Sequence, residues 1–399
     1  MKKWYVYMFL LVFPFFIVST QPISAETINE GQAEEKEKQG FVDEQIQRLN
    51  LDDIIQYWEQ ISTEYGGYLP ESQKGSLFDF LTGDKTFSFK EWAIGLLKFL
   101  FHEIIAGGRL LGSLILLTVF CLILQSIQNA FEHQTVSKVA YAITYLVLMI
   151  LALNSFRLAI DYAEYAVSNM TNFMVAMLPL LLALMATIGN ITSAALFHPL
   201  IVFLVHTSGL LIQYLVFPLL FLSTVLHIVS TLTDHYKVTK LAGLLRTIAV
   251  GALGVFLTVF LGVISVQGAS TAVADGLTVR TAKFIAGNFV PVVGRMFTDA
   301  ADTVLSASLL LKNTIGIAGL VIMLILCAFP AIKILGLAFI FNFTAAVLQP
   351  LGGGPIIDCL SIIGRAIIYV FAALAIVCLM FFLAITIMIS ASNVSFMIR

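Results

Sequence analysis

The sequence predicts an all-α fold: a polytopic helical membrane protein with about seven to nine transmembrane helices and a small helical extracytoplasmic N-terminal domain. Hydrophobic residues make up 59% of the 399 residues and charged residues only 12%, against about 45–50% and about 25% in soluble domains. Apolar runs of about 20 residues, the length that crosses a hydrocarbon core, fill most of the chain. A leader and an acidic stretch precede these runs.

Residues 1–25 have the three parts of a secretory signal peptide. Two lysines precede an apolar run from Trp4 to Val18, and small residues lead up to Ala25. We predict cleavage after Ala25. An uncleaved anchor is the alternative, because Ile23 is β-branched where a smaller residue is usual. Both alternatives place residue 26 onward outside the cytoplasm.

Residues 26–108 are predicted to form an acidic extracytoplasmic helical domain. Between Glu26 and Glu103 lie 16 of the 24 acidic residues, with only seven basic residues. After a polar lead-in, apolar residues recur at helical spacing up to Gly66-Gly67, which predicts one or two amphipathic helices that pack on each other or on a partner. From this stretch we predict a partner surface that contains Ile54, Trp58 and Ile61.

A further helix of this domain is predicted to begin at Ser88. Ser88 and Glu91 have the spacing of a capping box, in which each side chain satisfies a free backbone N–H of the first turn. The aromatic residues that follow are typical of a helix at the membrane interface.

Residues 109–399 are predicted to form the multi-pass transmembrane domain. Nine apolar windows are candidate spans: 109–128, 138–156, 173–190, 196–216, 217–232, 246–267, 314–330, 333–350 and 365–391. Pro218 and Pro330 lie near the middles of two stretches that are too long for one span. Because proline removes a backbone donor, we predict a hinge, turn or break at each.

Charge predicts the orientation. With residues 26–108 outside, an odd number of spans leaves the C-terminus in the cytoplasm. Lys237, Lys240 and Arg246 then fall on a cytoplasmic loop, as the positive-inside rule requires.

The two proline-containing stretches resemble each other. Each is followed by a polar connection and an apolar run headed by arginine, at Leu241–Arg246 and Leu360–Arg365. Units of three spans would be inverted repeats, as in many secondary transporters. The alternative is that apolar sequences resemble one another through composition alone.

Residues 268–313 are too polar for a span and too apolar for a free loop. Five charged residues stand at helical spacing there, which favours an amphipathic or re-entrant element that lines a water-filled path. These pathway candidates are Arg280, Lys283, Arg295, Asp299 and Asp302. A pair of surface amphipathic helices is the alternative.

A glycine run follows the second proline-containing stretch. Gly352, Gly353 and Gly354 are predicted to permit close packing or to act as a hinge, with a flexible connection as the alternative.

The motifs of catalysis are absent from the sequence. It contains no phosphate-binding loop, zinc-protease motif or nucleophile elbow. Two pairs of histidines eight residues apart, His198 with His206 and His227 with His235, have no cysteine or acidic partners at metal-ligand spacing. We therefore predict no enzyme and no catalytic, cofactor-binding or metal residues. Nucleic acid is not an expected partner, because no basic patch exists to neutralise phosphates.

Several stretches closely resemble the stage III sporulation protein AE family of endospore formers. They are Val279-Arg-Thr-Ala-Lys283, Gly287-Asn-Phe-Val-Pro-Val-Val-Gly-Arg-Met-Phe-Thr-Asp299, Ser306-Ala-Ser-Leu-Leu-Leu-Lys-Asn313 and Ala346-Val-Leu-Gln-Pro-Leu-Gly-Gly-Gly-Pro355. The likeness extends over essentially the whole chain, including the leader and the acidic segment.

The resemblance implies a place in the mother-cell membrane that faces the forespore, within a channel or secretion complex. The implied partners are the other membrane proteins of the stage III A operon and, through them, a forespore protein called Q. The implied role is support of forespore development and late forespore gene expression. A stand-alone secondary transporter for a small solute is the alternative hypothesis.

Overall fold

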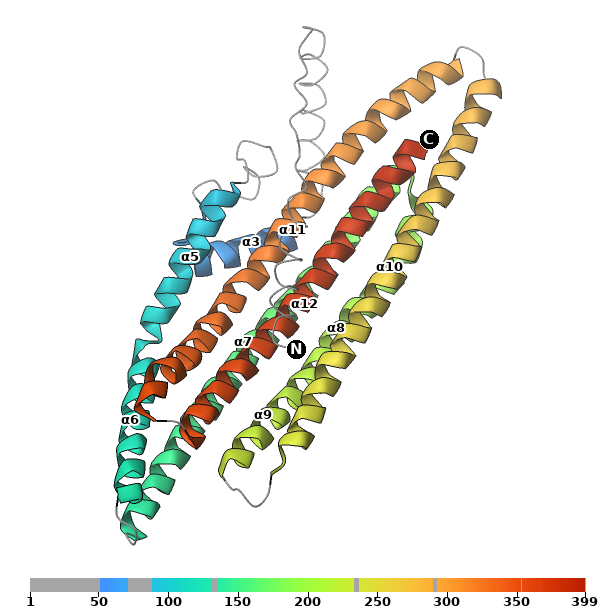
Figure 1. Ribbon diagram of the computed structural model, residues 1–399. Helices are drawn as coiled ribbons and strands as arrows, with labels where there is room; N and C mark the ends of the chain where they lie inside the picture. Colours follow the sequence, from blue (N-terminus) through green and yellow to red (C-terminus); the bar gives the residue numbers. More distant parts are fainter. Residues whose placement is uncertain are drawn as a thin grey trace.

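The computed structural model of the protein describes residues 51–70, 88–130, 135–232, 237–289, 293–352 and 354–398. Every regular element within these ranges is helical (Figure 1), which confirms the predicted all-α polytopic class. The predicted leader, residues 1–25, and the lead-in up to residue 50 lie outside these ranges.

The described elements are helices that range from 3 to 56 residues in length. In chain order they are α3 (Asp52–Tyr65), α5 (Phe89–Ala106), α6 (Gly108–Ala130), α7 (Thr135–Thr187), α8 (Ile191–Leu211), the π-helix η3 (Ile212–Val216), α9 (Phe217–Leu232), α10 (Thr239–Phe289), α11 (Val293–Leu348), the 3₁₀ turn η4 (Gln349–Leu351) and α12 (Pro355–Ile398).

Two predicted boundaries of the N-terminal helices are confirmed. Helix α3 ends at Tyr65, directly before the Gly66-Gly67 pair. Helix α5 begins after Ser88, whose side-chain oxygen accepts a hydrogen bond from the backbone N–H of Glu91 at 3.5 Å.

Within the described ranges, six helical runs are long and apolar enough to cross a membrane: Gly108–Ile127, Val139–Thr187, Ile191–Thr231, Thr239–Thr281, Leu305–Leu351 and Pro355–Ser395. The nine predicted windows fall on these six runs, because three pairs of neighbouring windows each share one run. If each of these six runs crosses once, the C-terminus lies on the side on which α6 begins. The predicted cytoplasmic C-terminus depended on an odd number.

Pro218 does not reverse the chain. Helix α8 passes through the π-helix η3 into α9 without a connecting loop. Proline cannot donate to the carbonyl four residues earlier, which here belongs to Tyr214 within η3. A π-helical turn is one way in which a helix adjusts where its hydrogen-bond ladder is interrupted. Pro330 likewise lies inside α11, which continues to Leu348.

The continuity of the helices decides how the two similar stretches are oriented relative to each other. Each proline-containing stretch forms one continuous helical run, so each repeated unit holds two long helical runs rather than three spans. Helices α10 and α12, which carry the two arginines, run in the same direction through the bundle (Figure 1). The inverted arrangement expected from three spans per unit is therefore not found.

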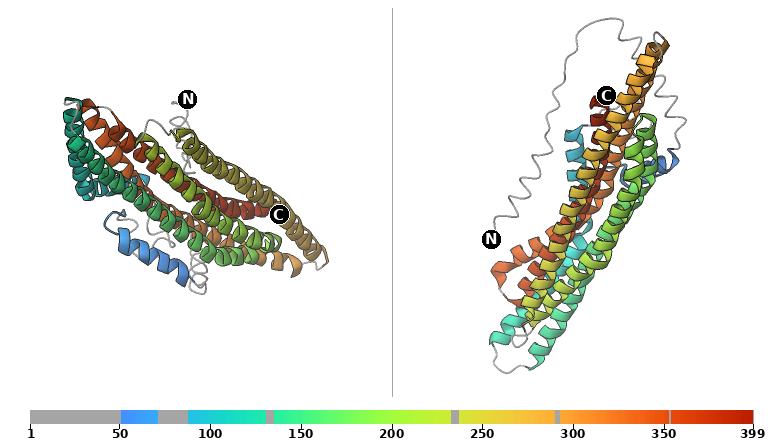
Figure 2. Two further views of the ribbon diagram at one scale, coloured as in Figure 1. Left: turned by 90° about the horizontal axis from the view of Figure 1, so that it is seen from below. Right: turned by 90° about the vertical axis from the view of Figure 1, so that its right-hand side faces the viewer.

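Helix α12 lies at the centre of the bundle, in contact with α7, α9, α10 and α11 (Figures 1 and 2). Small residues allow the long helices to approach closely. On α7, the fully buried Ala152, Ala159, Ala163 and Ala166 recur on one face. A Cβ added at Gly364 of α12 would lie 2.7 Å from the side-chain amide of Asn342 on α11.

The predicted glycine hinge joins η4 to α12 and packs against α6. Gly354 has φ +137°, a conformation that other residues rarely adopt, and an added Cβ would lie 3.3 Å from the amide of Gln125. A Cβ at Gly352 would lie 3.3 Å from Leu122. Gly353 lies outside the described residues.

Candidate functional site

The residues predicted as a partner surface face the protein's own bundle. Ile54, Trp58 and Ile61 are all buried, because α3 packs its apolar face against α7 and α11. The sequence pattern identified the apolar face correctly, but that face is already covered within the chain.

A cluster of aromatic rings fixes α3 beside α11. The Tyr65 ring stacks on Phe329 with centroids 4.0 Å apart, and Phe99 of α5 meets Phe329 edge-on at 4.9 Å. Lys333, one turn beyond Phe329, lies 3.8 Å from the Glu64 carboxylate and 5.6 Å from the Tyr65 ring centroid. Burial raises the pKa of Tyr65, so its hydroxyl stays protonated and donates to Glu64 at 2.5 Å.

The five predicted pathway residues lie on two helices. Arg280 and Lys283 belong to α10, whereas Arg295, Asp299 and Asp302 belong to α11. The segment 268–313 is thus divided between the ends of two long helices rather than forming an element of its own. The Arg280 side chain is exposed, and the other four side chains lie outside the described residues. Their role in a path stays a prediction.

Asp275 is a buried charge of the same segment, only 1% exposed. Its Oδ1 accepts from the backbone N–H of Thr192 at 3.0 Å and its Oδ2 from that of Ser193 at 2.9 Å. These are free N–H groups of the first turn of α8, whose own N-cap residue, Asn190, makes no side-chain cap hydrogen bond. A carboxylate of α10 therefore caps α8 and also meets the positive end of its dipole.

Lys312 of α11 is the second buried charge, also 1% exposed. Its Nζ donates to the backbone carbonyl of Ile389 at 2.9 Å and to Oδ1 of Asn393 at 3.0 Å, both on α12. Two residues further along α12, Ser395 donates to Oδ1 of Asn190 at 2.8 Å. We call this group the polar layer: Asn190, Asp275, Lys312, Asn393 and Ser395.

The polar layer joins the start of α8 and the last turns of α12 to interior positions of α10 and α11. Charged side chains inside a membrane domain normally belong to a functional site or are paired with another polar group of the protein. Here each charge is held by polar atoms of another helix, and the described residues place no carboxylate within ion-pair distance of Lys312. Because Asp275 and Lys312 lie within the segment 268–313, the arrangement fixes the register of the helices in the same segment as the pathway residues.

Sequence reasoning did not select Asp275 or Lys312. A signal was present, because each is the only charge in a long apolar run, between Arg246 and Arg280 and between Asp302 and Lys333. Within the described part of the chain, no group of three His, Cys, Asp or Glu side chains is placed to hold a metal ion. The four cysteines are buried free thiols.

Comparisons with known proteins agree on one family. Residues 72–392 match the family described as stage III sporulation protein AE. The chain is 62% identical over 374 residues to the stage III sporulation protein AE of Bacillus subtilis (strain 168), an alignment that covers 92% of this chain and 94% of that protein. No solved structure matches the chain. The chain belongs to the stage III sporulation protein AE family.

Proposed function

We propose that this protein is a membrane subunit of the channel or secretion complex between the mother cell and the forespore. In this role it supports forespore development and late forespore gene expression. Its partners are the other membrane proteins of the stage III A operon and, through them, the forespore protein Q. Family membership supports the role in sporulation, and the outer surface of α10 supports assembly with other proteins.

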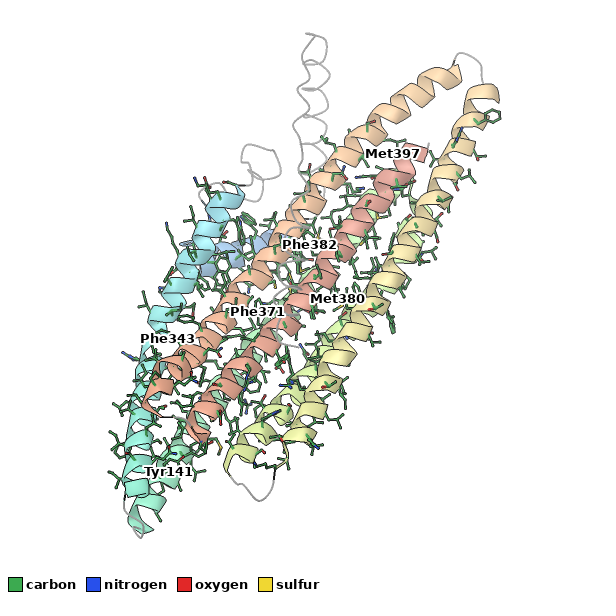
Figure 3. All side chains as sticks on the ribbon, viewed as in Figure 1. Tyr141, Phe343, Phe371, Met380, Phe382 and Met397 are labelled. Carbon is green, nitrogen blue, oxygen red and sulfur yellow. The ribbon has the colours of Figure 1, made fainter. Side chains whose placement is uncertain are left out.

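Helix α10 lies at the edge of the bundle, and side chains project outward along it (Figure 3). Its exposed large apolar side chains extend over residues 241–284: Leu241, Leu244, Ile248, Val250, Val255, Val259, Val263, Val266, Val273, Leu277 and Phe284. At the rise of an α-helix this row is about 65 Å long.

A single bilayer cannot cover a row of that length. The hydrocarbon core is about 30 Å thick, and even a tilt of about 40° lengthens the path through it only to about 39 Å. We call the last part of the row, more than about 39 Å beyond Arg246 at helical rise, the distal α10 face: Val273, Leu277 and Phe284. Leu277 is 61% exposed and Phe284 69%. An apolar face beyond the lipid needs a protein partner to cover it.

The stand-alone transporter has less support. Its main argument was an inverted repeat, and the proline-containing stretches are single helices that give units of the same orientation. Exposed apolar surface beyond the thickness of a bilayer is also unfavourable for a protein that acts alone.

Co-purification from sporulating cells tests the proposal. A double variant, Val273→Gln with Leu277→Gln, is expected to lose co-purifying sporulation membrane proteins and to form few mature spores. Its insertion and abundance should remain normal, because both positions lie at the surface. Thr278→Gln, at an exposed polar position of the same helix, is the matched control and should keep its partners.

Reconstitution of the purified protein into liposomes separates the two hypotheses. The complex subunit should be inert without its partners. Uptake or exchange of a small solute by the protein alone, together with unchanged partners in the double variant, would contradict the proposal.

A further inference from the structure

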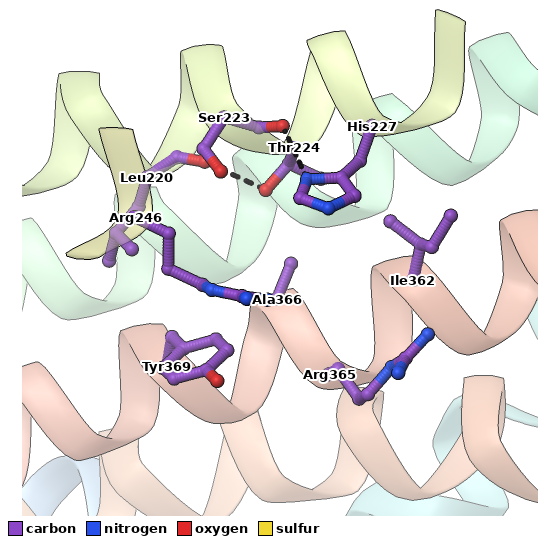
Figure 4. Close-up of a pocket in the computed structure, with 9 residues that line it drawn as sticks. All are labelled: Leu220, Ser223, Thr224, His227, Arg246, Ile362, Arg365, Ala366 and Tyr369. Carbon is purple, nitrogen blue, oxygen red and sulfur yellow. Dashed lines mark hydrogen bonds between the residues drawn. The ribbon is translucent and has the colours of Figure 1, made fainter. Parts of the chain in front are cut away.

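A cavity of about 170 Å³ lies between α9, α10 and α12 (Figure 4). Its two arginines lie in the early parts of α10 and α12, whereas Asp275 and Asn393 of the polar layer lie in the late parts of the same helices. Helix α10 contributes one arginine, α12 contributes a second, and α9 contributes a histidine and two hydroxyl groups. The lining residues that matter here are Ser223, Thr224, His227, Arg246, Arg365 and Tyr369.

The cavity is strongly cationic. Two guanidinium groups, of Arg246 and Arg365, line it, and none of its lining residues is acidic. Among the described residues, no carboxylate lies within ion-pair distance of either arginine. Two like charges that share one small cavity repel each other, and an anion between them would remove that cost.

Local contacts fix the helices around the cavity but leave the guanidinium groups without an acidic partner. The Ser223 hydroxyl donates to the carbonyl of Ala242 at 2.6 Å, which ties α9 to α10 one turn before Arg246. The Arg246 guanidinium lies 5.2 Å from the centroid of the Tyr369 ring, so α12 supports it from the other side.

The remaining donors point to an acceptor-rich ligand. Nε of Arg365 donates to the carbonyl of Ser361 at 3.1 Å, which leaves its two terminal nitrogens as donors. The carbonyl of Ser223 can only accept, so Nδ1 of His227, 3.2 Å away, carries the proton of the neutral ring. Its Nε2 is then an acceptor, so the two guanidinium groups are the cationic donors available to a ligand. Figure 4 shows both guanidinium groups and the imidazole around the same space.

We propose that this cavity binds the phosphate group of an anion. Planar guanidinium groups pair with phosphate oxygens in bidentate fashion, and two of them match a group with several acceptor oxygens. The volume is below the range of about 300–1,000 Å³ typical of sites for whole small molecules. A single phosphate is therefore a better match than a nucleotide.

The position of the cavity indicates the source of the phosphate. Arg246 and Arg365 lie about two to three turns after the starts of the apolar runs that begin at Thr239 and Pro355, near the same end of the bundle. A phospholipid headgroup lies at this depth, at the boundary of the hydrocarbon core. Free inorganic phosphate has the same chemistry and is the other source that the experiment distinguishes.

The test uses the full-length protein, delipidated in dodecyl maltoside and free of phosphate buffer. Its thermal unfolding midpoint is measured with inorganic phosphate, with dihexanoyl phosphatidylglycerol and with dihexanoylglycerol, which has no phosphate. A ligand that binds only the folded state raises the midpoint. We expect phosphatidylglycerol to raise it by several degrees and dihexanoylglycerol to leave it unchanged. An equal rise with inorganic phosphate would identify free phosphate as sufficient.

Variants decide whether the rise comes from this cavity. Arg246→Gln with Arg365→Gln should abolish it, whereas Lys240→Gln, at an exposed cation on the same end of α10, should keep it. If the glutamine variant does not fold, Arg246→Lys with Arg365→Lys keeps the charge and should weaken binding by on the order of tenfold. No rise with either phosphate compound, a full rise in the arginine variants, or an equal loss in Lys240→Gln would overturn the proposal.

Discussion

Helices α10 and α12 meet charged side chains near both of their ends, and the two groups of charges differ in burial and in hydrogen bonding. At one end, Asp275 and Lys312 are closed off from solvent, and each is hydrogen-bonded to polar atoms of a neighbouring helix. At the other end, Arg246 and Arg365 line an open cavity without a carboxylate. The same two long helices connect both sites.

The difference separates a structural use of charge from a binding use. A charged group whose hydrogen bonds are satisfied within the chain fixes helix positions and has few free donors or acceptors for a ligand. Two arginines without a carboxylate partner in the chain, by contrast, keep hydrogen-bond donors that can bind an anion. Substitutions should therefore affect stability at the polar layer and ligand response at the arginine cavity.

The largest expected effect on stability is at Asp275. Asp275→Ala removes two charge-assisted hydrogen bonds and leaves the first turn of α8 uncapped, so we expect a loss of about 3 kcal/mol. Unfolding of the purified protein in detergent measures it. Thr278→Ala, at an exposed position on the same helix, should stay within about 0.5 kcal/mol of the wild type. Equal effects of the two substitutions would remove the capping role.

Lys312→Met should have a smaller effect. The variant loses two hydrogen bonds, but it also removes a buried charge, and such exchanges for apolar residues are often close to neutral. We expect a change of less than about 1 kcal/mol, measured in the same unfolding experiment. A loss as large as that of Asp275→Ala would show that the ammonium group is a principal clamp between α11 and α12.

Arg365→Gln should have the smallest effect in the absence of ligand. The side chain is exposed and makes its hydrogen bond within its own helix. We expect the unfolding midpoint to stay that of the wild type in phosphate-free detergent, with a difference within about 0.5 kcal/mol. A clear loss of stability without phosphate would mean that this arginine supports the fold, and the contrast between the two ends would disappear.

The sequence was sufficient for the fold class and for element boundaries with strong local signals. Apolar composition predicted the polytopic helical body, and the capping residue Ser88 marked the start of α5. It did not reveal how continuous the helices are. Proline at 218 is a local signal for a break, but a π-helical turn accommodates it and the tertiary packing keeps the rod continuous.

The candidate sites were harder to predict, for a related reason. Periodicity shows which residues share a face of a helix but not which helix that face meets. Trp58 was recognised as part of an apolar face, whereas the bundle that covers it comes from residues far along the chain. Arg246 and Arg365 stood out as a repeated feature, but their meeting depends on α10 and α12 running in the same direction.

The central claim is that the distal α10 face is covered by other proteins of a sporulation complex. Site-specific photo-crosslinking in sporulating cells tests it most directly, with the reactive side chain placed at Leu277 and, separately, at Val255. Both positions are exposed on α10, but only Leu277 lies more than a bilayer thickness from Arg246. We predict protein adducts at Leu277 and mainly lipid contact at Val255. Absence of protein adducts at Leu277, with normal abundance of the protein, would contradict the account.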